Sequence, residues 1–202
     1  MLKYYNHDIV FQEYPDEVTL AINLTLCPNR CIGCHSAFLR EDIGEELTPE
    51  RITALIDANE GITCVGIQGG DNDPEAVLAL CHYVQTHYQG RIRTGWYSGR
   101  TWQPTPIQLQ QSLNYLKLGP YISKLGPLSS PTTNQRFYAV NASDGTLKDM
   151  TERFLRKSLV YKKSTLCNLD DCIRCLIFYW ILWNEDFLIL VCPTFTTPAT
   201  LV

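Results

Sequence analysis

Apolar and polar residues alternate along residues 17–23 (EVTLAIN). The alternation places Val18, Leu20 and Ile22 on one face, which is typical of a β-strand with one buried side. Short apolar runs predict four further strands, at residues 64–68, 92–97, 115–118 and 136–140. The pattern therefore predicts a sheet whose strands are distributed between residues 17 and 140.

Three helices are predicted between these strands, and each has the same kind of start. A residue that can cap a helix stands directly before a proline, in the pairs Thr48-Pro49, Asp73-Pro74 and Thr105-Pro106. Strands and helices in alternation predict right-handed βαβ units, and therefore an α/β fold with a parallel sheet. The functional loops of such a sheet lie at the carboxyl ends of its strands.

The chain changes character after about Lys157, which divides it into residues 1–157 and 158–202. All 12 glycines lie in the first part, whereas the second has two dense apolar runs, at 176–183 and 187–191. Neither run approaches the roughly 20 apolar residues that a membrane helix needs. The second part also holds four of the nine cysteines, namely Cys167, Cys172, Cys175 and Cys192.

Three interpretations of this atypical C-terminal extension are open. Its cysteines could hold an auxiliary iron–sulfur cluster, or they could hold a zinc ion. The third interpretation is that the extension is not an evolved part of the fold, as an altered reading frame would produce. We favour the third, because an auxiliary domain is expected to contain turn glycines.

The composition favours a soluble globular protein, with 45% hydrophobic and 19% charged residues in a chain of 202. The net charge of −4 argues against a general nucleic-acid binder, which would have a basic excess. Near the N-terminus, Asn6, His7 and Asp8 interrupt any apolar stretch, so no signal peptide is indicated. We therefore expect a cytoplasmic protein with no nucleic-acid or membrane partner. In that compartment, clustered cysteines favour metal ligands over disulfides.

Three cysteines follow the first predicted strand at spacing C-x3-C-x2-C: Cys27, Cys31 and Cys34. A four-iron cluster needs one ligand for each iron, so three thiolates leave one iron open. An open iron can chelate the amino and carboxylate groups of S-adenosylmethionine (SAM), whose carbon–sulfur bond an electron from the cluster can then cleave. The alternative is a structural zinc site. We favour the cluster, because this spacing is poor for zinc and His35, the candidate fourth ligand, is adjacent to Cys34.

The segment CPNRCIGC resembles the signature of the radical SAM superfamily. Gly69-Gly70-Asp71, which follows a predicted strand, resembles the Gly-Gly-Glu-type motif of that superfamily, with aspartate in place of the more common glutamate. The motif implies that the backbone and the acid hold the methionine amino group of SAM. A plain turn before a helix is the alternative. The resemblance also implies a partial (βα) barrel of the radical SAM type.

A narrower resemblance covers roughly residues 1–154. The segments CPNRCIGCHS, GGDNDPE, TGWYSGR, YLKLGPYI and SPTTNQRFY are similar to those of the activating proteins of anaerobic ribonucleoside-triphosphate reductases. The resemblance implies that Cys27, Cys31 and Cys34 hold a catalytic [4Fe-4S] cluster. It further implies a set of residues beside SAM: Gly33, Cys34 and His35 near the adenine, Gly70 at the methionine portion, and Tyr97 and Ser98 near the ribose.

The function implied by this resemblance is that of a glycyl-radical activating enzyme. Such an enzyme uses a 5′-deoxyadenosyl radical to remove hydrogen from a backbone glycine of its partner, the large subunit of the reductase, and needs a low-potential electron donor. Two alternatives are open. One is a pyruvate formate-lyase-type activase or a small-molecule enzyme of the same superfamily, and the other is a non-catalytic metal-binding adaptor.

Overall fold

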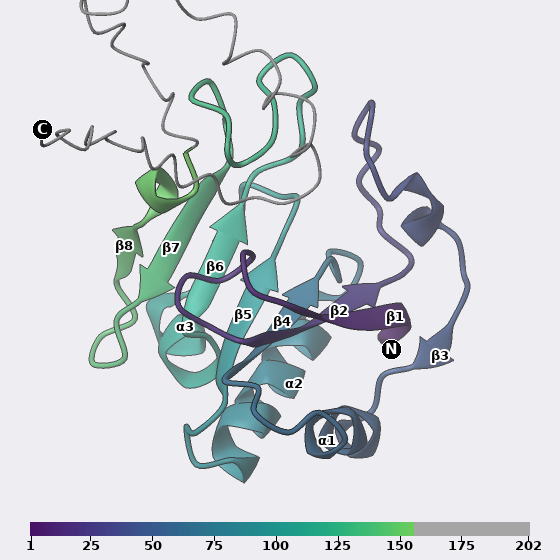
Figure 1. The fold of residues 1–202 in the computed structure, drawn as a ribbon, viewed down its shortest axis with the longest axis vertical. Coiled ribbons are helices and arrows are strands. Elements are labelled where there is room, and N and C mark those ends of the chain that lie inside the picture. The colour runs from purple at the N-terminus through teal and green to yellow at the C-terminus, as the bar shows by residue number, and fades with distance from the viewer. Residues whose placement is uncertain (156–202) are drawn as a thin grey trace, which may run out of the picture. The chain divides into compact units, whose positions relative to one another are not determined.

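Eight strands form a single sheet in the order β3-β1-β2-β4-β5-β6-β7-β8 (Figure 1). The structure, a computed structural model, describes residues 1–155, and the expectations for the extension at 158–202 and its four cysteines lie outside this range. The strands are β1 (Lys3–Val10), β2 (Thr19–Leu24), β3 (Glu45–Glu46), β4 (Cys64–Gln68), β5 (Arg93–Tyr97), β6 (Tyr115–Leu118), β7 (Arg136–Val140) and β8 (Leu147–Asp149).

The four central strands, β2, β4, β5 and β6, are parallel, as the alternation of strands and helices predicts. The helices α1 (Pro49–Asp57), α2 (Pro74–His87) and α3 (Pro106–Ser112) connect them in turn. The outer strands are antiparallel to their neighbours. The prediction of a parallel sheet is therefore wrong at β7, because no helix separates β6 from β7 and the chain reverses direction directly.

Each helix begins where its cap was predicted. The Thr48 side chain accepts a hydrogen bond from Arg51 N, and the Asp73 side chain accepts one from Ala76 N. At α3 the cap is reciprocal, since the Thr105 side chain and Gln108 form a complete capping box. These caps satisfy backbone donors that the first turn leaves free, and they fix where each helix leaves the sheet.

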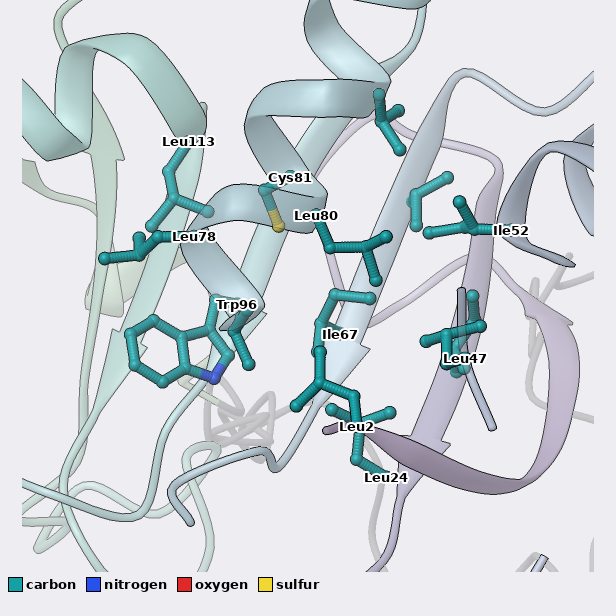
Figure 2. Close-up of a cluster of buried hydrophobic side chains, with 14 of the residues drawn as sticks. Leu2, Leu24, Leu47, Ile52, Ile67, Leu78, Leu80, Cys81, Trp96 and Leu113 are labelled. Atoms are coloured by element: carbon teal, nitrogen blue, oxygen red, sulfur yellow. The ribbon is translucent and has the colours of Figure 1, made fainter. Parts of the chain in front are cut away.

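The three helices lie on one face of the sheet, where they bury an aliphatic core (Figure 1). Ile67 from β4 and Trp96 from β5 contribute to this core, together with Leu78 and Cys81 from α2 (Figure 2). Cys81 is buried here, as a small apolar residue would be. The helices thus pack against one face of the central strands only, and a different segment of the chain covers the other face.

The opposite face is covered by the segment between β1 and β2, which crosses in front of the central strands in Figure 1. Tyr14 of this segment is 0% exposed and packs against Tyr97, Tyr115 and Phe137. Its ring lies directly over Gly66 of β4 and Gly95 of β5. A Cβ at either glycine would overlap the ring, so the ring can take this place only because both residues are glycine. These two strand glycines therefore allow the segment to approach the sheet closely.

The observed fold is mixed α/β, in agreement with the predicted class. The sheet ends at β3 and β8, and within residues 1–155 no pairing joins these two edge strands into a closed barrel. No helix in the same part of the chain is long and apolar enough to cross a membrane.

Candidate functional site

The predicted site residues follow the carboxyl ends of parallel strands, and so lie at one edge of the sheet. The cysteine loop follows β2, Gly69-Gly70-Asp71 follows β4, and Ser98 follows β5. Backbone hydrogen bonds join these strand ends, from Gly69 N to Tyr97 O at 3.0 Å and from Ser98 N to Lys117 O at 2.9 Å. The topology therefore brings the three predicted motifs to the same edge.

The cysteine loop has a defined backbone. It starts with Leu26, whose φ of +59° is in the left-handed region that non-glycine residues seldom adopt. Cys27 N then donates to Leu39 O at 3.0 Å, and Arg40 Nη2 donates to Cys31 O at 2.8 Å. These bonds hold the ends of the loop to the chain that follows it, so the positions of Cys27 and Cys31 are set by local contacts.

The three thiols are reduced and partly buried. Burial raises the pKa of the Cys27 thiol above its usual value, although a hydrogen bond with Asn29 opposes this shift. The neighbouring Asp71, Cys31 and Cys34 raise the pKa further by charge repulsion. A thiolate at Cys27 is therefore unfavourable alone and would be stabilised by a bound metal cation, because metal binding removes the proton.

The three thiols of the cysteine loop are a donor set that an iron–sulfur cluster accepts. Within residues 1–155, no three His, Cys, Asp or Glu side chains converge on the position of one ion. His35, the fourth ligand of the alternative zinc site, is exposed, and its Nδ1 lies 3.3 Å from Ser36 Oγ. A cubane places each thiolate on a different iron, so its ligands need not converge on one point. Three soft thiolates from one loop suit such a cluster.

Two consecutive glycines carry the chain from β4 toward α2 in a left-handed conformation, with φ of +96° at Gly69 and +86° at Gly70. A Cβ at Gly70 would lie 2.8 Å from Leu24 Cδ1 and would overlap Val77. Gly70 is therefore required by the backbone and by core packing, whatever else it does. A substitution there tests the fold before it tests ligand binding.

Asp71 is 1% exposed and accepts hydrogen bonds from two other loops. Its Oδ1 accepts from Ser98 Oγ at 2.6 Å, and its Oδ2 accepts from Gly99 N at 2.8 Å and from Asn29 Nδ2. All three donors are uncharged. Among residues 1–155, no cationic group lies within ion-pairing distance of this carboxylate. The site thus contains a buried carboxylate whose charge is not neutralised by an ion pair.

The structure places Tyr97 and Ser98 in this region, but both are occupied by protein contacts. The Tyr97 hydroxyl donates to Glu13 O, and burial raises its pKa well above the usual value. Ser98 is buried, and its hydroxyl holds Asp71. Tyr97 and Ser98 thus hold neighbouring parts of the chain in place at this edge of the sheet. Their contact with a ribose stays a prediction.

Gly33 and His35 lie at the exposed tip of the cysteine loop. Gly33 has φ of +75°, and a Cβ there would meet Tyr121 Cε1 at 3.7 Å and Ser123 Cβ at 3.6 Å. The tip therefore lies beside the segment that follows β6, which belongs to the YLKLGPYI resemblance. The predicted adenine contacts of Gly33, Cys34 and His35 are not tested by this arrangement.

Two polar residues that were not predicted as site residues also lie at this edge. Lys117 is 8% exposed, and its Nζ donates to Gly119 O at 2.8 Å. Burial lowers its pKa to about 8, although nearby Asp71 and Cys31 favour its charged form. Gln68 has a buried Nε2 with no hydrogen-bond partner in the described part of the chain. For Lys117 the sequence offered a signal, namely a lysine within the apolar run YLKL. For Gln68 nothing in the segment CVGIQ indicated a role in the site.

Register places these two residues in one row. Gln68 pairs with Tyr97 on the neighbouring strand, and Tyr97 pairs with Lys117 on the next. Residues in register on adjacent strands point to the same face of a sheet. The row therefore lines the face opposite the helices at the edge where the cysteine loop lies, and the buried Gln68 Nε2 is its one donor without a partner in residues 1–155.

Comparison with family models, with curated proteins and with solved structures finds no match for this chain. The resemblance to radical SAM enzymes therefore depends on the quoted sequence motifs alone.

Proposed function

We propose that the protein is a glycyl-radical activating enzyme of the radical SAM type, with the sheet acting as a partial (βα) barrel. Its reaction would use SAM to remove a hydrogen atom from a backbone glycine of the anaerobic ribonucleoside-triphosphate reductase. The observation that carries this proposal is the juxtaposition of three reduced thiols on one loop with a buried carboxylate that has no ion-pair partner in residues 1–155.

Cys27, Cys31 and Cys34 would hold the [4Fe-4S] cluster, and their spacing leaves one iron without a protein ligand. When bound, the cluster supplies the electron that cleaves the carbon–sulfur bond of SAM, and this electron must come from a low-potential donor. The protein contributes the binding and orientation of SAM, as proteins generally do for reactive cofactors.

Asp71 is suited to the ammonium group of SAM. A carboxylate has about four acceptor positions, of which the three observed hydrogen bonds occupy three. A cationic ligand would also balance a buried charge that is costly while unpaired. Lys117, buried on the neighbouring part of the same face, has a cationic side chain that suits a carboxylate of the ligand.

A protein substrate is suggested by the exposure of the cysteine loop. Ile32, between Cys31 and Gly33, has 85% of its surface exposed. A carbon radical formed beside such a loop must be shielded from solvent and from side reactions. A partner protein that covers this edge would provide the shield and would bury Ile32, which agrees with a macromolecular substrate.

Anaerobic reconstitution tests the proposal. The wild-type chain should bind iron and acid-labile sulfide, and the reduced protein should release 5′-deoxyadenosine from SAM. Cys31→Ala should abolish both properties, because it leaves two irons without a protein thiolate. Cys81→Ala is the matched control, since Cys81 lies on α2 with its side chain buried in the aliphatic core and should be dispensable for the cluster.

The alternatives give different results in the same experiment. A protein that takes up zinc and no iron would be a metal-binding adaptor and would exclude both enzymatic interpretations. A protein that cleaves SAM but produces no radical on the reductase would be an activase or a small-molecule enzyme with another substrate.

A further inference from the structure

The loop between the first two cysteines contains a residue that reaches a different part of the sheet. Asn29 lies two residues after Cys27 and two before Cys31. Within residues 1–155, the hydrogen bond from Asn29 Nδ2 to Asp71 Oδ2 is the only one that joins residues 27–36 to the loops after β4, β5 and β6. All other polar contacts of this loop are made within residues 27–40.

Asp71, which accepts this hydrogen bond, makes two further hydrogen bonds. Asp71 follows two glycines with fixed left-handed backbones, and its other hydrogen bonds are to Ser98 Oγ and Gly99 N. The Ser98 hydroxyl itself accepts from Arg100 N at 3.1 Å. Asp71 is therefore held by the chain after β5, and Asn29 is held by Asp71.

Gly99 provides the space that the amide occupies. A Cβ at Gly99 would lie 2.5 Å from Asn29 Nδ2 and 3.3 Å from Asp71 Oδ2. Any larger residue at this position would displace the amide from the carboxylate. The contact thus depends on a third residue from another loop, and it is not a chance meeting of two surface side chains.

The backbone of Asn29 faces the other half of the site. Its carbonyl oxygen lies 3.9 Å from Cys27 Sγ, within the distance at which a thiol donates a hydrogen bond. In the metal-free chain Asn29 therefore contacts a proposed cluster cysteine through its main chain and Asp71, the proposed partner of SAM, through its side chain. The thiol bond is given up when a cluster takes the place of the thiol proton, whereas the bond to Asp71 does not depend on that proton.

We propose that Asn29 is a positioning residue that sets the place of the cysteine loop relative to Asp71, and that the affinity for SAM depends on it. The inference rests on the proposed function, because it needs a cluster on the cysteines and SAM beside Asp71. SAM bound to the open iron and to Asp71 spans the two elements that Asn29 joins. A change in their relative position would misalign one end of the ligand.

The test compares Asn29→Ala and Asn29→Asp with Arg30→Ala, which changes the adjacent exposed residue and removes no hydrogen bond of the described chain. Each reconstituted protein is measured for iron content, for the SAM dissociation constant, and for the change that SAM causes in the electron paramagnetic resonance spectrum of the reduced cluster. The iron-free chains are compared by amide hydrogen exchange at Gly99, whose N–H donates to Asp71.

We expect full iron content in every variant. Asn29→Ala should weaken SAM binding roughly tenfold, the effect of losing one hydrogen bond to a charged group. Asn29→Asp should weaken it roughly a hundredfold, because two carboxylates then face each other. Both should reduce the spectral change caused by SAM and speed exchange at Gly99, whereas Arg30→Ala should stay within about twofold of wild type in affinity.

Three outcomes separate this inference from the function on which it rests. Wild-type affinity and an unchanged spectrum in Asn29→Ala would overturn the inference and leave the function standing. Loss of iron in Asn29→Ala would also overturn it, because Asn29 would then serve the cysteine loop alone. A wild-type protein that binds iron but not SAM would overturn the proposed function, and the inference with it.

Discussion

Two buried carboxylates lie at opposite ends of the parallel strands, and their surroundings differ in one respect. Glu17, at the amino ends, is 6% exposed and accepts hydrogen bonds from Arg93 Nη1 at 2.6 Å and Tyr115 OH at 2.7 Å. A third bond comes from Thr63 Oγ1 at 2.5 Å. Asp71, at the carboxyl ends, also accepts three bonds, but all of its donors are neutral.

The difference lies in charge, because both carboxylates are well hydrogen-bonded. The Arg93 guanidinium balances Glu17, so this end of the sheet is complete without a ligand. Asp71 has no ion-pair partner in residues 1–155. The cation of Lys117 is close enough for Asp71 to favour the charged lysine but forms no ion pair with it. A buried carboxylate without an ion pair is costly and is commonly found where a protein binds something. Under the proposed function, the amino ends serve stability and the carboxyl ends serve binding.

The largest expected effect concerns the glycines beneath Tyr14. Gly95→Ala would place a methyl group inside the buried Tyr14 ring, which should lower the free energy of unfolding by about 3 kcal/mol. Gly33→Ala, at the cysteine loop, meets only ordinary contacts and should cost about 1 kcal/mol for its positive φ. Denaturant unfolding of the iron-free chains measures both. Equal losses of unfolding free energy in the two variants would contradict the difference in packing between the sheet beneath Tyr14 and the cysteine loop.

The second prediction concerns variants in which each buried carboxylate is replaced by the isosteric, uncharged amide. Asp71→Asn keeps acceptors for Asn29 and Gly99, and its new amide can donate to the Ser98 hydroxyl. It should reduce the rate of 5′-deoxyadenosine release about a hundredfold, comparable to losing one oriented charged contact. Its thermal midpoint should stay close to that of the wild type, since no hydrogen bond is lost.

Glu17→Gln is the matched variant at the other end. It removes the ion pair with Arg93 and should lower the free energy of unfolding by about 2 kcal/mol, with little effect on SAM cleavage in the folded protein. A Glu17→Gln protein that is stable but inactive, or an Asp71→Asn protein that is unstable but active, would reverse the assignment of the two ends.

The smallest expected effect is the pH dependence contributed by Lys117. Burial lowers the pKa of this lysine from 10.5 to about 8 in the folded chain. Between these values the unfolded chain binds more protons, so stability rises with pH through this window, and below pH 8 the buried cation lowers stability by a constant amount. Lys117→Met should therefore be more stable than wild type below pH 8, on the order of 2 kcal/mol, and lose this advantage as pH rises.

Denaturation midpoints of the variant and the wild type from pH 7 to pH 10 check this window. The exposed Lys148 provides the control substitution Lys148→Met, which should follow the wild type throughout. A constant difference between Lys117→Met and wild type across the range would show that Lys117 keeps an ordinary pKa.

The sequence was sufficient for the central strands and for the starts of the helices. Cys64–Gln68 and Tyr115–Leu118 have the predicted bounds, because buried parallel strands are short continuous apolar runs. The helix starts followed from local capping, which needs no tertiary contact. The strands β1, β3 and β8 were not predicted, because β1 has one mostly exposed face and the other two have two and three residues.

The site was predictable in part for the same reason. Alternation of strands and helices was sufficient to bring the cysteine loop, Gly69-Gly70-Asp71 and Ser98 to one edge. Contacts between different loops were not predictable, since the meeting of Asn29 with Asp71, 42 residues apart, depends on the exact twist and register of the sheet. The burial of Lys117 was likewise not predictable, because it depends on which face of β6 the segment between β1 and β2 covers.

The central claim is that the carboxyl ends of these strands generate a radical on a partner protein. The most direct measurement is an anaerobic mixture of the reduced, reconstituted protein, SAM and the anaerobic ribonucleotide reductase, followed by electron paramagnetic resonance. The account predicts a glycyl-type doublet that requires all three components and is absent with Cys31→Ala. SAM cleavage that is equally fast with and without the reductase, together with no doublet, would contradict the account.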